Sequence, residues 1–384
     1  MPMLRFVQTS DWHLGQAYGN VADAGLSASL RQARLEAVTR VLLQSVQLGA
    51  AFVLVAGDQF EGNLPDRETV TGMLDRVGAH PRMPVHMIPG NHDPAGAGSV
   101  YERADFAKGA PPNLHFHGRA GAVPLPEHGA TLYPCPCLAQ VGDDPLAWIP
   151  PRSEADGFRV ALAHGSLPRF ANSGDRNYPI RDDAPAFHDL DYVALGDWHT
   201  ANPDPEALPR ERMYYAGAPE VGGWDETHAG TLLEVTLSTG KAPEVRAHHV
   251  RQFDWFHLDD ELHDAEDVRR FLEGLDRKAS ATTLARVRPR GALPIAERIA
   301  LEAEIAARTA AFACLSWDGR DLRATIESDA DLPSDRLIRE VYRRLLRLDA
   351  NPADEPPAGL PKSVPGLDAE VVTRALSYFR GHLS

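Results

Sequence analysis

The chain has 384 residues, with 54 acidic and 39 basic side chains and a formal net charge of −15. This length allows two or three domains, and the 43% of hydrophobic and 24% of charged residues exclude a disordered, collagen-like or coiled-coil chain. No apolar run reaches the ~18–20 residues of a membrane helix, no signal peptide is visible, and three cysteines cannot form a disulfide framework. We therefore expect a cytoplasmic protein without a membrane partner.

Strand and helix patterns alternate over the first 250 residues. Apolar strands are predicted at 4–7, 52–55, 84–88, 159–163 and 192–195, and helices at 30–48 and 66–79. Alternating residues at 230–237 and 244–250 predict two antiparallel strands that close this region. The sequence therefore predicts an α/β domain over residues 1–250.

The pattern changes after residue 250. Helices at 264–275 and 294–311 and strands at 282–288 and 321–327 predict a small α+β domain over 251–330. The remaining segments are predicted as an amphipathic helix at 331–348, a proline-rich linker at 349–366 and a C-terminal helix at 367–384. Because the last helix carries an apolar stripe, we expect it to dock on a partner or on its own domain.

Polar side chains that can bind metal ions follow five of the predicted strands. They are Asp11 and His13, Asp58, Asn91 and His92, His164, and Asp197 and His199. Because ligands bind beyond the carboxyl ends of parallel strands, we expect these side chains to converge on one site. Imidazole suits zinc, iron or manganese, whereas carboxylate and amide oxygens suit harder ions. The mixed set favours a pair of divalent ions that act in phosphoryl transfer.

Several of these residues also have a purely structural interpretation. Any one of the strand-end residues could simply shape a turn, His164 could be a core histidine, and Asp197 could cap a helix. The pair Cys135 and Cys137 lacks the partner spacing of a metal site and is interpreted as structural or incidental. The complete ordered set nevertheless favours the metal site.

The order of the motifs resembles the calcineurin-like metallophosphoesterase superfamily, whose pattern is D-x-H, G-D, G-N-H-[DE], a lone His and G-H-x-H. The resemblance implies a four-layer β-sandwich flanked by helices, with residues 251–330 as a small capping domain. It also implies the role of each site residue. The first metal would be held by Asp11, His13 and His199, the second by Asn91, His164 and Asp197, with Asp58 bridging both and His92 contacting the phosphate and assisting the leaving group.

Asp197 stands where the family has a histidine. A carboxylate is shorter, harder and negatively charged, so we expect it to keep the second site and to shift its preference toward harder ions such as Mn²⁺. The cofactor prediction is therefore two divalent ions, with Mn²⁺ preferred.

Three segments resemble the SbcD-type DNA repair nucleases, the catalytic partners of SMC-like ATPases. They are the opening from Phe6 to Gly15, His164-Gly165-Ser166, and Tyr215-Ala216-Gly217-Ala218-Pro219. This resemblance implies an exo- or endonuclease that uses a metal-bridging hydroxide, with DNA as substrate and a coiled-coil ATPase or a second copy as partner. Two other functions stay open: a small-molecule phosphodiesterase or phosphatase, which the acidic charge favours, and a docking subunit whose metal site is weakened by Asp197.

Overall fold

The structure is a computed structural model that describes residues 3–325, except for 20, 154, 170–176 and 227. The chain divides into two units: Met1–Phe256 with Ser280–Ala285, and His257–Ala279 with Arg286–Ser384. The predicted segments 331–348, 349–366 and 367–384 lie outside the described residues. Among the residues described, no helix is both long enough and apolar enough to cross a membrane.

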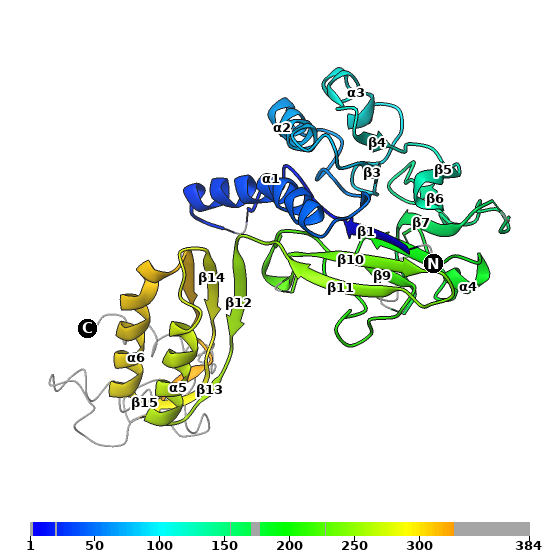
Figure 1. Cartoon of the computed structure of the whole chain (residues 1–384). Coiled ribbons are helices and arrows are strands. Elements are labelled where there is room, and N and C mark those ends of the chain that lie inside the picture. The colour runs from blue at the N-terminus through cyan, green and yellow to red at the C-terminus, as the bar shows by residue number, and fades with distance from the viewer. Residues whose placement is uncertain (1–2, 20, 154, 170–176, 227, 326–384) are drawn as a thin grey trace, which may run out of the picture. The chain divides into compact units, whose positions relative to one another are not determined.

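Two sheets form the framework of the first unit (Figure 1). The first sheet has the order β11-β10-β1-β2-β3-β4, and the second has the order β5-β6-β7-β8-β9. The strands of the first sheet are β1 (Met3–Thr9), β2 (Val53–Ala56), β3 (Val85–Ile88), β4 (Leu114–Phe116), β10 (Thr231–Ser238) and β11 (Glu244–His249). Those of the second are β5 (Val123–Leu125), β6 (Ala130–Cys135), β7 (Phe158–His164), β8 (Tyr192–Gly196) and β9 (Met213–Tyr215).

The pairing of the strands sets the direction in which each one ends. Strands β1 to β4 are parallel, and so are β6 to β9. Strand β10 is antiparallel to both β1 and β11, as the alternation at 230–237 and 244–250 predicts. The carboxyl ends of the parallel strands within each sheet therefore lie along one edge.

Alternation of side chains along the strands places apolar residues on both faces of each sheet. Phe6 of β1, Leu54 of β2 and Leu162 of β7 belong to one buried cluster. This cluster fills the space between the two sheets. The neighbouring residues, such as Val7 and Val55, belong instead to the cluster on the helical side of the first sheet. The predicted sandwich is confirmed.

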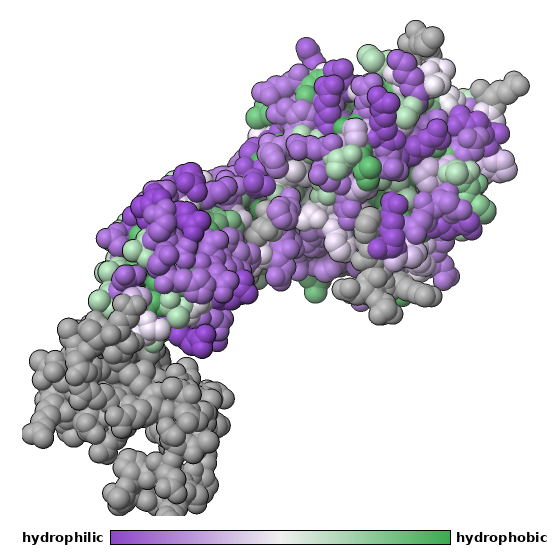
Figure 2. Space-filling model, turned by 90° about the horizontal axis from the view of Figure 1, so that it is seen from below, coloured by the Kyte–Doolittle hydropathy of each residue, from purple (hydrophilic) through white to green (hydrophobic). Residues whose placement is uncertain are grey.

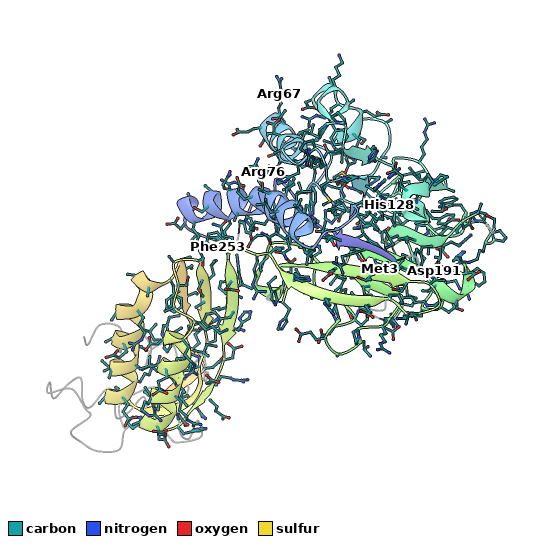
Figure 3. The ribbon with its side chains drawn as sticks, in the orientation of Figure 1. Met3, Arg67, Arg76, His128, Asp191 and Phe253 are labelled. Atoms are coloured by element: carbon teal, nitrogen blue, oxygen red, sulfur yellow. The ribbon has the colours of Figure 1, made fainter. Side chains whose placement is uncertain are left out.

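Helices cover the outer face of the first sheet. On the first sheet lie α1 (Ala24–Gln47), α2 (Arg67–Gly78), the 3₁₀ turn η1 (Val100–Glu102) and α3 (Ala104–Gly109). The first two begin at aspartates, Asp23 and Asp66, whose side chains accept backbone N–H groups of the first turn at 2.6 and 2.7 Å. Arg76 of α2 (labelled in Figure 3) pairs with Glu36 of α1 at 2.5 Å, which ties the two helices together.

The second sheet is covered by loops and by short helical segments. They include α4 (Ala184–Phe187), whose Ala184 belongs to the buried cluster on this face. The unit also contains the 3₁₀ turns η2 (Pro126–His128) and η3 (Trp224–Glu226). Apolar residues of the loops, such as Leu146 and Leu167, pack with Ala161 and Val193 on the outer face of β7 and β8. On the face seen in Figure 2, hydrophilic side chains predominate and the apolar ones are scattered, as on most protein surfaces.

Residues 254–325 add two three-stranded sheets and two helices. One sheet has the order β12-β14-β16, and the other, which is parallel, has the order β13-β15-β17. The strands are β12 (Asp254–Leu258), β13 (Glu261–Leu262), β14 (Thr283–Val287), β15 (Arg290–Pro294), β16 (Cys314–Trp317) and β17 (Leu322–Thr325). The predicted helices at 264–275 and 294–311 correspond to α5 (Ala265–Asp276) and α6 (Ile295–Arg308), which η4 (Thr309–Ala311) follows.

Candidate metal centre

The predicted site residues follow the carboxyl ends of five parallel strands. Asp11 follows β1, Asp58 follows β2, Asn91 follows β3, His164 ends β7, and Asp197 follows β8. The backbone φ angle is positive at Asp11 (53°), Asp58 (55°) and Asp197 (110°). Side chains other than glycine seldom adopt such angles, and they persist at sites where the surrounding structure enforces them.

The glycines of these motifs allow the strand ends to approach closely. A Cβ atom on Gly90 would lie 2.0 Å from Asp58 Oδ1, and one on Gly196 would lie 1.9 Å from the carbonyl oxygen of Ala56. A Cβ atom on Gly57 would lie 2.4 Å from His164 Nδ1. Only glycine therefore lets the Asp58 and His164 side chains occupy their places.

Asp11, His13 and His199 form the first group of potential ligands, with ligand atoms within 4.8 Å of one another. His13 Nδ1 lies 3.1 Å from Glu61 Oε2, and His199 Nδ1 lies 2.5 Å from Glu226 Oε1. A carboxylate can only accept a hydrogen bond, so each Nδ1 carries the proton. The two Nε2 atoms, which lie 3.1 Å apart, therefore both face the site, and a shared cation could bind them in place of a proton.

Asp11, Asp58 and His164 form a second group. His164 is completely buried, and its Nδ1 donates to the carbonyl oxygen of Ala56 at 2.9 Å, which leaves Nε2 facing the site. That Nε2 atom lies 2.7 Å from Asn91 Oδ1 and 3.5 Å from Asp58 Oδ2. Asp58 Oδ2 also lies 3.6 Å from His13 Nε2, so this carboxylate stands between the two groups.

Asp197 lies beside these groups but is not a member of any of them. Its Oδ2 accepts the hydroxyl of Ser166 at 2.7 Å, and its Oδ1 lies 3.9 Å from His164 Nε2. Its backbone N–H donates to Asp11 Oδ1 at 3.1 Å, so the residue also positions Asp11. Burial raises the pKa of the Asp197 carboxyl. A cation bound nearby would lower this pKa again, because it favours the ionised carboxylate.

His92 is exposed at the edge of the site. Its backbone N–H donates to Asp58 Oδ1 at 3.0 Å, and its ring lies 4.9 Å from the ring of His13. His13, Asp58 and His92 also form a group whose ligand atoms lie within 4.8 Å. The distances thus place His92 within reach of either a metal ion or a substrate bound beside one.

The charges of the site act on one another strongly. Burial opposes ionisation of Asp58, but the positive charges of His164, His13 and His92 outweigh it and lower the pKa of Asp58. Burial also lowers the pKa of His164, yet the Asp58 and Asp11 carboxylates raise it to about 9. The cluster therefore favours positive charge at its centre, and the arrangement of inward nitrogens and carboxylate oxygens fits divalent cations.

The sequence model of calcineurin-like phosphoesterases matches residues 4–207, which is more than half of the chain. The chain belongs to the calcineurin-like phosphoesterase family. The D subunit of the nuclease SbcCD from Rhodobacter capsulatus is 33% identical over 301 residues, which cover 62% of this chain and 68% of that protein. The crystal structure of TT1561 of Thermus thermophilus has 12% sequence identity and a TM-score of 0.37, over 65% of this chain and the whole of that one.

Several residues that support this phosphoesterase site were not singled out from the sequence. Glu61 and Glu226 fix the protonated nitrogens of the two histidines in the first group, and Ser166 holds Asp197. Asp93 is completely buried and accepts the N–H groups of Gly90 and Phe60 at 2.7 and 2.9 Å, which shapes the loop that carries Asn91 and His92. Of these, Asp93 and Ser166 lie inside recognised motifs and had a sequence signal, whereas Glu61 and Glu226 had none.

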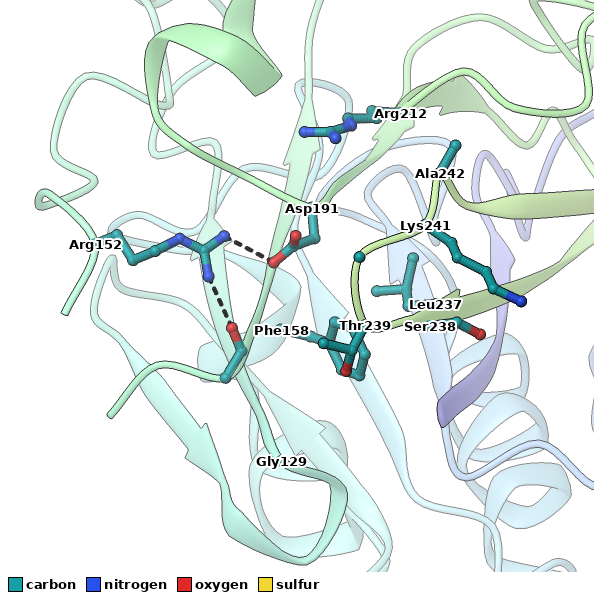
Figure 4. A pocket seen from close by; sticks show the side chains of 12 residues that line it. Gly129, Arg152, Phe158, Asp191, Arg212, Leu237, Ser238, Thr239, Lys241 and Ala242 are labelled. Atoms are coloured by element: carbon teal, nitrogen blue, oxygen red, sulfur yellow. Dashed lines mark hydrogen bonds and ion pairs between the residues drawn. The ribbon is translucent and has the colours of Figure 1, made fainter. Parts of the chain in front are cut away.

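A cavity of about 750 Å³ lies elsewhere in the phosphoesterase unit (Figure 4). It is lined by the residues that precede β7 and β8 and by the turn between β10 and β11, and it contains none of the predicted site residues. The guanidinium of Arg152 is occupied there by the carbonyl oxygen of Gly157 at 3.0 Å and by Asp191 at 2.9 Å. Among the described residues, no group of three potential metal ligands lines this cavity, and all three such groups lie at the strand ends.

Proposed function

We propose that this chain is a phosphodiesterase that uses two divalent metal ions to cleave DNA. Asp11, His13 and His199 would hold the first ion, Asn91, His164 and Asp197 would hold the second, and Asp58 would bridge them. The observation that carries the proposal is the orientation of three imidazoles, each fixed through Nδ1 so that Nε2 faces the carboxylates. The mixed nitrogen and oxygen donors suit Mn²⁺.

Bound divalent ions would supply charge neutralisation for the phosphate and an activated water as nucleophile. The side chains would do the rest. The backbone N–H of His92 donates to Asp58 and so holds His92 beside the carboxylate that would bridge the ions. His92 Nδ1 lies 3.4 Å from the carbonyl oxygen of Glu61. The other ring nitrogen, Nε2, would then contact a phosphate oxygen and give a proton to the leaving group.

DNA is proposed as substrate because the relative from Rhodobacter capsulatus is described as a nuclease subunit. The net charge of −15 favours the alternative, a small phosphodiester or phosphomonoester, since a protein that binds DNA usually carries positive charge at the interface. The two functions share the metal centre and differ only in substrate. A docking subunit, the third candidate, need not bind two ions.

The test uses the purified full chain with Mn²⁺ and an Asp58→Asn variant as control. Labelled linear duplex, circular single strand and a bis-aryl phosphate are each incubated with both proteins. We expect the wild-type chain to cleave DNA and the aryl ester, and the variant to cleave neither. Hydrolysis of the aryl ester alone would refute the DNA substrate, and failure to bind two ions per chain would refute the dinuclear centre.

We also propose a cytoplasmic location, because the three cysteines of the sequence are too few for a disulfide framework. Burial raises the pKa of Cys135 to about 12, so this thiol is unreactive. An SMC-like ATPase and a second copy of the chain remain the proposed partners. The segment that would bind them, 367–384, lies outside the described residues, so co-purification of the full chain with candidate partners is the appropriate measurement.

A further inference from the structure

Arg34 is a buried arginine that no motif of the sequence explains. It lies on α1 and is only 2% exposed. Its guanidinium donates to three groups: the carbonyl oxygen of Trp12 at 2.8 Å, the hydroxyl of Tyr18 at 3.0 Å and the carbonyl oxygen of Glu220 at 3.2 Å. Burying a guanidinium costs free energy unless its N–H groups find acceptors. These three acceptors therefore hold the Arg34 side chain in one fixed place.

One side of the guanidinium holds the loop that carries two potential ligands of the first group. Trp12 lies between Asp11 and His13, whose φ angles are 53° and 42°. The Nη1 atom that donates to the Trp12 carbonyl also lies 3.5 Å from the carbonyl oxygen of Asp11. Left-handed φ angles at two residues so close together cost free energy and persist only where the surrounding structure holds the backbone. Arg34 Nη1 contributes to this by contacting two backbone carbonyl oxygens of the loop.

The other side of the guanidinium adjoins the segment that orients His199. Glu226 accepts the N–H of Gly222 at 2.9 Å through Oε2 and holds His199 Nδ1 through Oε1. A Cβ atom on Gly222 would lie 2.6 Å from Glu226 Oε2 and 2.9 Å from Arg34 Nη2, so these two charged groups flank the same glycine. Arg34 therefore supports the Glu226 carboxylate both by its charge and by fixing the carbonyl of Glu220.

The proposed ligands of the second ion, which are Asn91, His164 and Asp197, are held by different partners. His164 bonds to the Ala56 carbonyl, Asp197 bonds to Ser166, and Asn91 is carried by the loop that Asp93 shapes. Within the described part of the chain, Arg34 makes no hydrogen bond to any of these groups. A change at Arg34 should thus affect one half of the site.

We infer that Arg34 is a positioning residue that sets the affinity of the first metal position, formed by Asp11, His13 and His199, separately from that of the second. The inference rests on the proposed dinuclear function. It extends that function by naming a side chain that places the ligands of one ion without binding the ion itself.

The experiment titrates the full chain with Mn²⁺ by calorimetry and compares wild type, Arg34→Lys and Arg159→Lys. Arg159 is the matched control, because it is completely buried and donates to the carbonyl oxygens of Pro150 and His188 at 2.6 and 3.2 Å, away from the ligands. Lysine keeps the charge, but its single nitrogen cannot reach acceptors that are served by three different nitrogens of the planar guanidinium. We expect Arg34→Lys to weaken one of the two sites by about 10–100-fold, and Arg159→Lys to leave both unchanged.

Anomalous scattering at the manganese edge, with limiting Mn²⁺, identifies the weakened site. The peak beside His13 and His199 should be lost in Arg34→Lys while the peak beside His164 remains. If Arg34→Lys does not fold, Tyr18→Phe removes one contact of the guanidinium and should weaken the same site by a smaller factor.

The possible failures can be told apart. A wild-type chain that binds two ions, together with variants of Arg34 and Tyr18 that bind both normally or lose both equally, overturns the role of Arg34 alone. That role is also overturned if Arg159→Lys weakens the first site as strongly. A wild-type chain that binds no Mn²⁺ overturns the proposed function, and the inference with it.

Discussion

Replacing Gly196 by alanine tests how tightly the strand ends are packed around His164. The new Cβ atom would lie 1.9 Å from the carbonyl oxygen of Ala56 and 2.8 Å from His164 Nδ1, so the hydrogen bond of 2.9 Å between these atoms must break. Overpacking costs about 1–3 kcal/mol, and a buried donor and acceptor left unsatisfied cost about 1–3 kcal/mol more. We expect the free energy of unfolding to fall by about 2–6 kcal/mol.

The assay is urea unfolding of metal-free protein, followed by circular dichroism. Gly62→Ala is the matched control, because the nearest atom to its new Cβ would be 3.9 Å away. That variant should change the free energy of unfolding by no more than about 0.5 kcal/mol. If Gly196→Ala costs less than about 1 kcal/mol, or no more than the control, the close approach does not constrain His164 and the reasoning is wrong.

His92→Ala should keep both ions and lower turnover about 10²–10⁴-fold, whereas loss of Mn²⁺ in equilibrium dialysis would make His92 a ligand. Crystals with Mn²⁺ should show an ion within ~2.0–2.2 Å of an Asp197 oxygen, and an Asp197 that contacts only Ser166 would contradict the second site. Burial and the nearby His117 lower the pKa of His86 from 6.5 to about 3, so the unfolded chain binds a proton that the folded chain excludes, and stability falls as the pH drops from 6.5 toward 3. At pH 5 the free energy of unfolding is lower by about 2 kcal/mol for this reason. Urea unfolding at pH 5 and pH 7 should show a smaller difference between the two pH values in His86→Asn than in wild type. An equal difference in the two proteins would refute the lowered pKa of His86.

Local patterns were sufficient for the elements that are apolar and uninterrupted. The strands at β1, β2, β3, β7 and β8 and the helices α1, α2, α5 and α6 were predicted within a few residues, except that α1 begins six residues earlier. Strands β5 and β6 were missed because Pro124 and Pro134 argue against strands. Only the pairing of β6 with β7 on one side and β5 on the other makes them extended.

The sequence by itself determined which residues follow the strand ends, because each motif is a local feature of the chain and all but the first contain a glycine. It could not determine Glu61, Glu226 or Arg34, whose roles depend on contacts with residues far along the chain. Arg34 reaches Glu220 across 186 positions, and no periodicity or spacing encodes such a contact. A ligand's identity is a property of its motif, but its orientation is set by whichever groups the fold packs behind it, and only the tertiary structure decides that.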